Sequence, residues 1–267
     1  DMTYRMAISY MTVGNVNQAA VWFETLRNTS KKYRKDSEYY VSYIRYTQNR
    51  LDEALSGFLS VQNDEKYKTL APYYIADIYL KQKQYDKAMA VAQDYLSAPS
   101  GEGFPGIMYA REMHRIMGEI YYIRGDYANA LTRLNSYWAE AGQPQRSALY
   151  MLGLSYYQTG VYSKAADALG EVTKVNDKLT QNAFLHLGLS YLQLAEKNKA
   201  RMAFEQAAAS YDDMKIKEQA AYNYALTIHE TSFSAFGESV NVFERFLNDF
   251  PNSVYADKIS NYLVDVY

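Results

Sequence analysis

"GEIYYIRGDYANAL" (residues 118–131) returns as "GLSYYQTGVYSKAA" (residues 153–166), 35 residues further along the chain. Both stretches keep glycine, tyrosine, tyrosine, glycine, tyrosine and alanine in the same order. Self-similarity at a fixed spacing indicates a repeat architecture, in which one small structural unit is built several times. The rest of the chain is therefore compared with this pair.

Four positions of the stretch recur along the chain at fixed offsets. Alanines equivalent to the one in "DYANA" lie 35, 34, 42, 35 and 35 residues apart: Ala19, Ala54, Ala88, Ala130, Ala165 and Ala200. A tyrosine precedes the alanine in every copy: Tyr10, Tyr46, Tyr79, Tyr121, Tyr156 and Tyr191. A small residue comes three positions before the tyrosine in five copies: Ala7, Ala76, Gly118, Gly153 and Gly188. A bulky apolar residue follows the alanine in all copies but the one with Ala92: Phe23, Phe58, Leu134, Leu169 and Phe204.

Each copy predicts two amphipathic helices of about 12–15 residues joined by a short turn, because apolar residues recur at helical spacing. Small residues are expected where the two helices approach closely, and large ones fill the space beside them. Gly14, Gly125 and Gly160 mark the turns, where a left-handed backbone favours glycine. Pro72 and Pro144 fall at helix beginnings and the other prolines between helices, so no proline interrupts a helix.

The recurring pattern resembles the tetratricopeptide repeat, which has a period of about 34 residues. The resemblance implies an all-α, right-handed superhelical solenoid of antiparallel helix pairs, with about seven pairs and a final helix. One array over residues 1–267 is expected, with repeats at 1–34, 36–66, 69–97, 107–141, 145–176, 179–212, 215–250 and a partial repeat at 253–267.

Two further resemblances concern the source and location of the protein. "NVFERFLNDFPNSVYADK" (residues 241–258) resembles repeats of bacterial cell-envelope proteins, including lipoproteins of outer-membrane assembly. The whole chain resembles part of the long, many-repeat tetratricopeptide proteins of the Bacteroides group. These resemblances imply a periplasmic or outer-membrane-associated protein, with a cytoplasmic location left open.

Composition excludes several classes of function. The 267 residues carry a net charge of −2, which gives no electrostatic basis for nucleic-acid binding. There is no cysteine, and hence neither a disulfide framework nor a thiolate nucleophile. No apolar stretch approaches the ~20 residues of a transmembrane helix. His114, His186 and His229 lack metal-ligand spacing, and no phosphate-binding loop or nucleophile elbow occurs. We therefore expect no enzyme, no metal and no cofactor.

The resembled family places its first helices, the N-terminal helix of each pair, along a concave groove. Residues at the corresponding positions form the candidate partner-binding groove: Tyr4, Tyr40, Tyr73, Asp77, Arg115, Glu119, Tyr122, Tyr150, Tyr157 and Tyr222. Tyrosines bury a large area at small entropic cost and suit the anchoring of a partner segment. The alternative is that these tyrosines, among 29 in the chain, only fill space between helices.

The favoured function is a non-catalytic scaffold that binds a protein or peptide segment in this groove, by analogy with the fold. The alternative is a cell-envelope module that binds glycan or acts in envelope or outer-membrane assembly. Members of the family that bind terminal carboxylates use groove lysines, arginines and asparagines. Here only Arg115 is of that kind, flanked by Glu112 and Glu119, so this mode is not expected.

Two insertions and both ends depart from the repeat. "APSGEGFPG" (98–106) and "TSFSAFGE" (231–238) predict loops, for which drift and a binding role are equally open. Exposure of Phe104, Phe233 or Phe236 would favour a binding role. The chain opens inside a first helix and closes with an uncovered apolar stripe: Tyr262, Leu263, Val266 and Tyr267. We therefore expect a piece of a longer array that self-associates end to end.

Overall fold

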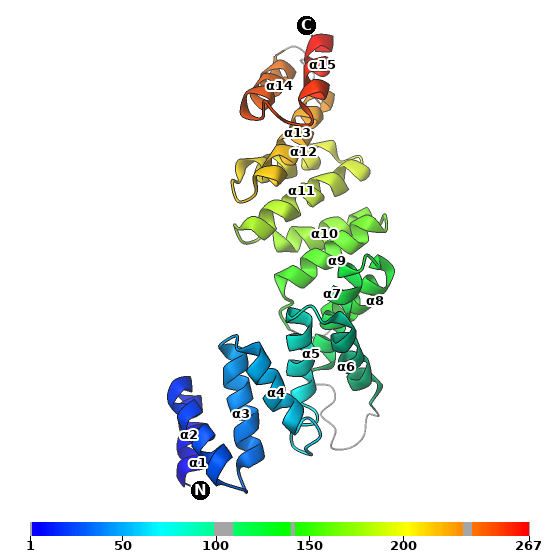
Figure 1. The fold of residues 1–267 in the computed structure, drawn as a ribbon. Helices are drawn as coiled ribbons and strands as arrows, with labels where there is room; N and C mark the ends of the chain where they lie inside the picture. The colour runs from blue at the N-terminus through cyan, green and yellow to red at the C-terminus, as the bar shows by residue number, and fades with distance from the viewer. Residues whose placement is uncertain (1, 99–108, 140–141, 232–236, 267) are drawn as a thin grey trace. The chain divides into compact units, whose positions relative to one another are not determined.

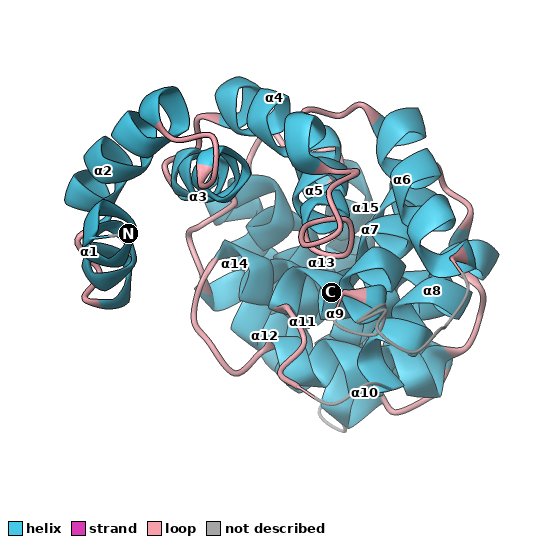
Figure 2. Cartoon of the chain, turned by 90° about the horizontal axis from the view of Figure 1, so that it is seen from below, coloured by secondary structure: helices cyan, strands magenta, loops and turns pink. Residues whose placement is uncertain are grey.

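The computed structural model describes residues 2–98, 109–139, 142–231 and 237–266. Over these residues the regular structure consists of fifteen α-helices and no strand. Figure 1 labels the helices along the chain, and Figure 2 draws them in cyan. The predicted all-α class of seven helix pairs and a final helix is confirmed. The predicted insertion at 98–106, with Phe104, lies almost wholly outside the described residues, as do Phe233, Phe236 and Tyr267.

The chain forms two compact units, Asp1–Ile120 and Tyr121–Tyr267, whose boundary falls inside α7. The first unit contains α1 (Met2–Thr12), α2 (Val16–Thr29), α3 (Arg34–Thr47), α4 (Leu51–Val61), α5 (Ala71–Lys81), α6 (Tyr85–Ser97) and most of α7 (Ala110–Ile123). The second contains α8 (Tyr127–Ala139), α9 (Arg146–Gln158), α10 (Tyr162–Val172), α11 (Lys178–Gln193), α12 (Lys197–Ala209), α13 (Met214–Thr231), α14 (Glu238–Asp249) and α15 (Ala256–Val266). The expected single array, with its repeat boundaries, stays a prediction.

Within each unit the helices stack in chain order. In the first unit each helix from α1 to α5 packs against the next, and in the second the same holds from α8 to α14. In the second unit the first helix α11 also packs against the first helices α9 and α13 on either side. The first helices α9, α11 and α13 therefore form one continuous layer, called the first-helix layer below, as stacked helical repeats do.

The small and large positions of the repeat meet inside each helix pair. A Cβ atom added to Gly188 would lie 2.5 Å from the ring of Phe204, and one added to Gly153 would lie 2.7 Å from Leu169. The recurring alanines and their bulky companions are at most 1% exposed. The expected close approach of paired helices, with the large side chain filling the space beside the small residue, is confirmed.

The turn inside each pair places one residue in the left-handed region. Gly14, Gly125 and Gly160 have φ angles of 77°, 75° and 79°, which confirms the expected role of these glycines. The equivalent turns of other pairs use three residues that carry side chains: Asn49, Lys83 and Ala195, at φ 60°, 59° and 58°. The repeat thus imposes one backbone geometry on the turn and tolerates its cost where glycine is missing.

A pair of glycine substitutions in α9–α10 separates backbone geometry from packing. Gly160→Ala is expected to destabilise the protein by about 1 kcal/mol, because alanine is strained at positive φ although its Cβ meets nothing within 4 Å. Gly170→Ala, inside α10 and equally free of neighbours, is expected to stabilise it by about 0.5–1 kcal/mol. Urea denaturation of both variants checks this. Two changes of the same sign would contradict the assigned backbone roles.

Candidate functional site

Three aromatic rings meet on the first-helix layer of the second unit. Tyr150 and Tyr157 lie two turns apart on α9, and the ring centroid of His186 on α11 is 6.1 Å from each of theirs. Tyr122, at the end of α7, packs against the same apolar cluster as Tyr150. All four side chains are half-buried. Tyr122, Tyr150, Tyr157 and His186 are called the aromatic patch below.

The sequence pattern of α9 explains why the patch forms on this side. Tyr150, Leu154 and Tyr157 follow one another at helical spacing and therefore share a stripe of the helix. Leu152 and Tyr156 belong to the opposite stripe, which packs in the core against α8 and α10. The stripe that carries Tyr150 and Tyr157 therefore faces the neighbouring first helices.

The patch is uncharged near neutral pH. Burial lowers the pKa of His186, against the opposing effect of its backbone hydrogen bond. In that bond Nδ1 donates to the Asn182 carbonyl at 2.9 Å, which leaves Nε2 as an acceptor. Burial also raises the pKa values of Tyr122, Tyr150 and Tyr157. The patch therefore offers ring faces and neutral hydrogen-bonding groups and no formal charge.

The other predicted groove tyrosines stack on aromatic neighbours within their own unit. Tyr4 stacks on Tyr33 and Tyr73 on Tyr109, with ring centroids 4.4 and 4.5 Å apart. In the second unit Tyr222 stacks on Tyr255 at 4.1 Å. Tyr33, Tyr109 and Tyr255 each come directly before a first helix, α3, α7 and α15. Tyr40 likewise stacks on Phe23 at 4.8 Å. These contacts join successive repeats, as the packing interpretation expects.

The charged residues of the predicted groove form a buried cluster in the first unit. Arg115 on α7 and Asp77 on α5 are each 4% exposed and lie 2.9 Å apart at Nη2 and Oδ1. The Arg115 guanidinium also donates to Glu112 at 2.6 Å and to Glu119 at 2.9 Å. Three carboxylates thus occupy the guanidinium, which supports the expectation that it does not hold the terminal carboxylate of a partner.

Hydrogen bonds decide the charge state of this cluster. Burial by itself raises the pKa of Asp77, but donors from Lys81, Tyr46 and Arg115 outweigh it and lower that pKa. The Tyr46 hydroxyl lies 2.6 Å and the Lys81 ammonium 2.7 Å from Oδ2 of Asp77. Burial raises the pKa of Glu119 in spite of its ion pair with Arg115. The ion pair between Asp77 and Arg115 thus joins α5 to α7 inside the first unit.

The structure gathers some of the predicted residues and separates others. Tyr122, Tyr150 and Tyr157 meet in one patch, whereas Asp77 and Arg115 are buried among their own partners. Sequence reasoning left Tyr46 and Lys81 out of the cluster, although Lys81 lies four residues after Asp77, the spacing of a helical ion pair. Contact of any groove residue with a partner stays a prediction.

Two searches of the described residues bear on other kinds of site. Among them there is no group of three or more histidine, aspartate and glutamate side chains arranged to hold a metal ion. Nor does any described helix combine the length and the apolar character that crossing a membrane requires.

Fold and first-helix layer together define a class: an all-helical repeat protein built from helix–turn–helix units. Sequence comparison gives the family. Residues 150–221 and residues 72–98 match sequence profiles of the tetratricopeptide repeat. These two parts of the chain carry tetratricopeptide repeats, as the resemblance predicted. No curated protein sequence matches it.

Solved structures of the same fold share little sequence with the chain. The C-terminal part of a repeat protein from Cytophaga hutchinsonii is 17% identical, with a TM-score of 0.65 over 96% of this chain and 98% of that one. YrrB, described as having an unusual peptide-binding site, is 15% identical, with a TM-score of 0.62 over 76% and 97%. A tetratricopeptide repeat protein from Parabacteroides merdae is 11% identical, with a TM-score of 0.53 over 99% and 97%.

Proposed function

We propose that the protein is a non-catalytic scaffold that holds a segment of a partner protein against its first helices. The aromatic patch of the second unit is the centre of this contact. Its four rings are half-buried and lie together on neighbouring first helices, which is the single observation that carries the proposal. Half-buried rings with polar tips supply large, rigid contact areas, as binding hot spots do.

The neutrality of the patch indicates the chemistry of the segment. Tyrosine hydroxyls and the Nε2 acceptor of His186 hydrogen-bond to backbone amides, while the ring faces bury apolar side chains. An uncharged, largely apolar peptide therefore fits better than an acidic or basic one. The peptide-binding site named for YrrB adds support by analogy of fold alone.

A peptide selected on the immobilised protein from a random displayed library tests the proposal. We expect Tyr157→Ala to weaken binding of the synthetic peptide at least about tenfold, which corresponds to about 1.4 kcal/mol. Because the patch is uncharged, the affinity should change little between low and high salt. Titration calorimetry measures both effects, with circular dichroism as the check on folding.

Tyr211→Ala is the matched control for this experiment. Tyr211 is 76% exposed and lies in the α12–α13 connection, away from the patch. Its replacement should leave peptide binding unchanged. Selected peptides that bind the parent and the Tyr157→Ala variant equally well would remove the patch from the proposal.

The remaining expectations are proposals of the same standing. Absence of catalysis accords with the scaffold role typical of the family. The envelope location rests on the resemblance of residues 241–258, and fractionation of the source cells tests it. End-to-end self-association likewise stays a prediction. The alternative of a glycan-binding module gains support from a cleft outside the first-helix layer, described next.

A further inference from the structure

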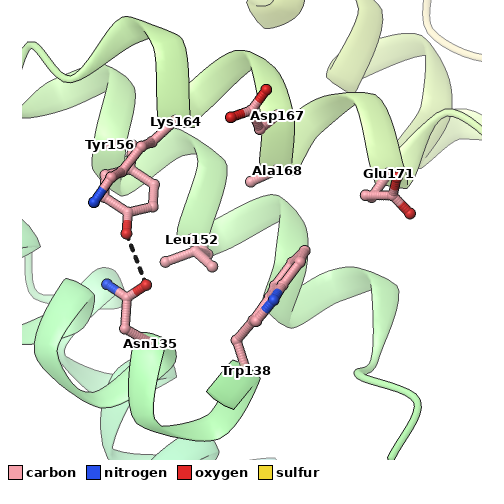
Figure 3. A pocket seen from close by; sticks show the side chains of 8 residues that line it. All are labelled: Asn135, Trp138, Leu152, Tyr156, Lys164, Asp167, Ala168 and Glu171. Carbon is pink, nitrogen blue, oxygen red and sulfur yellow. Dashed lines mark hydrogen bonds between the residues drawn. The ribbon is translucent and has the colours of Figure 1, made fainter.

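A cleft of about 420 Å³ opens between α8, α9 and α10 in the second unit. Its floor is Leu152 of α9, which Figure 3 shows between the indole of Trp138 on one side and the Tyr156–Asn135 pair on the other. Trp138 is 40% exposed, so part of its indole is open to a ligand. The volume falls in the range of about 300–1,000 Å³ that is common for small-molecule sites.

Internal contacts hold the far end of the cleft in place. The Tyr156 hydroxyl donates to Oδ1 of Asn135 at 2.7 Å, and Nδ2 of Asn135 donates to the Leu131 carbonyl at 2.8 Å. The Lys164 ammonium lies 5.6 Å from the centre of the Tyr156 ring. This end is therefore a pre-organised polar wall, and the tyrosine oxygen keeps a lone pair for a further donor.

Charges along the cleft cancel. Lys164 and Asp167 of α10 carry opposite charges, and Glu171 forms an ion pair with Lys174. Asp167 lines the cleft and is exposed, so its oxygens are open to a ligand's hydroxyl groups. The cleft offers hydrogen-bond donors and acceptors at its edges without a net charge, which disfavours an anionic or cationic ligand.

We propose that this cleft binds a neutral pyranose sugar. A pyranose ring has an apolar face, which would lie on the exposed indole, and hydroxyl groups around its rim that both donate and accept hydrogen bonds. Asp167 would accept from one edge of the sugar, and Lys164 would donate to another. A ligand without an apolar face leaves Trp138 uncovered, and a ligand without hydroxyl groups leaves the polar side chains of the wall unpaired.

A second cleft in the same unit shows which of these features are special. It lies at the corresponding place between α12, α13 and α14 and measures about 440 Å³. Two repeat lengths after Trp138, Ala208 replaces the indole. In the last helix pair Ser239 stands where the other repeats have the recurring alanine. Counted from it, Arg245 occupies the position that Glu171 has after Ala165, and it lines this cleft. A gap between second helices thus occurs in both places, but the exposed indole belongs to the α8–α10 cleft.

Indole resonances report directly on the proposed contact. The chain has two tryptophans, and Trp22 lies in α2 of the first unit, so Trp138 and Trp22 give separate Nε1–H signals in ¹H–¹⁵N spectra. Titration with methyl β-glucopyranoside, methyl β-galactopyranoside and N-acetylglucosamine should shift the Trp138 signal saturably at millimolar concentration, the range expected for a ligand of this size. The Trp22 signal should stay in place. The Trp22→Phe variant assigns the two signals.

Two variants connect the shift with the cleft. Asp167→Asn is exposed and should fold normally, and we expect it to weaken sugar binding about tenfold through the loss of a charge-assisted hydrogen bond. Trp138→Ala should abolish saturable binding. Because this variant lacks the reporting indole, its binding is measured by calorimetry. Tyr211→Ala, in the second cleft, is the control that should leave binding unchanged.

Three results would overturn the proposal: no saturable shift of Trp138 with any of the sugars, the same shift with glycerol, and unchanged affinity in Asp167→Asn. A shift with N-acetyl-leucine amide but not with the sugars would assign the cleft to a protein side chain, which also overturns it. These outcomes are separate from the peptide experiment, since that one concerns α7, α9 and α11 on the first-helix layer.

Discussion

Gly188→Ala is expected to destabilise the protein by about 3 kcal/mol, the upper end of the range for overpacking a core. The new Cβ would lie 2.5, 2.6 and 2.9 Å from three ring atoms of Phe204. Phe204 is fully buried in the cluster formed by α11, α12 and α13, so its ring cannot turn out into solvent to relieve the clash. Relief of the clash requires the paired helices α11 and α12 to separate.

A double-mutant cycle with Phe204→Leu tests the origin of this loss. Phe204→Leu alone removes buried ring atoms and should cost about 1–2 kcal/mol. Because the smaller side chain makes room for the Cβ at position 188, the double variant should lose at least about 1 kcal/mol less than the sum of the single losses. Denaturant titration gives the three values, and hydrogen exchange locates the weakened pair. Additive losses would show that the ring is not what excludes the Cβ.

The same pair explains why the fold could be read from sequence. Gly153 and Leu169 occupy the corresponding positions of the preceding repeat and are as tightly packed. Each repeat must bury its own small and large residues against its neighbours. The same pairing of a small with a large residue therefore recurs several times in the sequence. Agreement among copies separates this signal from chance, and helix pairs follow directly.

Contacts without a repeated signature could not be predicted. The buried Gln181 amide donates to the carbonyls of Ala207, Ser210 and Asp213, and its oxygen accepts from the Asp213 backbone. This arrangement closes the α12–α13 connection and depends on a glutamine that is not part of the recurring pattern. The exposed Trp138 is likewise found in a single copy, and nothing in its local sequence distinguishes it from a core tryptophan.

The candidate site was predictable to an intermediate degree. The repeat register placed Tyr122, Tyr150 and Tyr157 on first helices, and the structure brings them together. Register alone does not show which tyrosines stack on a neighbour from the next repeat, as Tyr73 does on Tyr109. That depends on the residue directly before the following helix, which lies outside the recurring pattern.

Arg115→Met is expected to destabilise the protein by about 3–5 kcal/mol, the range for removing one partner of a buried ion pair. Methionine keeps much of the apolar stem, so the loss reports mainly on charge. Asp77 retains its hydrogen bonds from Tyr46 and Lys81, but Glu119 loses the Arg115 guanidinium, which donates to it at 2.9 Å. The carboxylates of Asp77, Glu112 and Glu119 would then lie close together in a largely buried site without the guanidinium between them.

The pH dependence of this loss distinguishes charge from packing. Burial already raises the pKa of Glu119, and without the opposing guanidinium this native pKa rises further above its unfolded value of about 4. A native pKa raised above the unfolded one means that stability increases as the pH falls through the native pKa toward the unfolded value, because the native state binds the proton first. The difference between variant and parent should therefore shrink between about pH 7 and pH 5. Thermal or urea unfolding across this range measures it.

Two further variants make the cause specific. Adding Glu119→Gln to Arg115→Met should recover part of the loss, because it removes one uncompensated buried charge. Arg50→Met removes the exposed Arg50–Glu53 pair, which is 2.6 Å long yet open to solvent, and should have no measurable effect. If the loss in Arg115→Met were independent of pH and untouched by Glu119→Gln, lost packing of the arginine stem would explain it. In that case the larger effect of Arg115→Met than of Arg50→Met would reflect the buried packing of the Arg115 side chain and not its ion pairs.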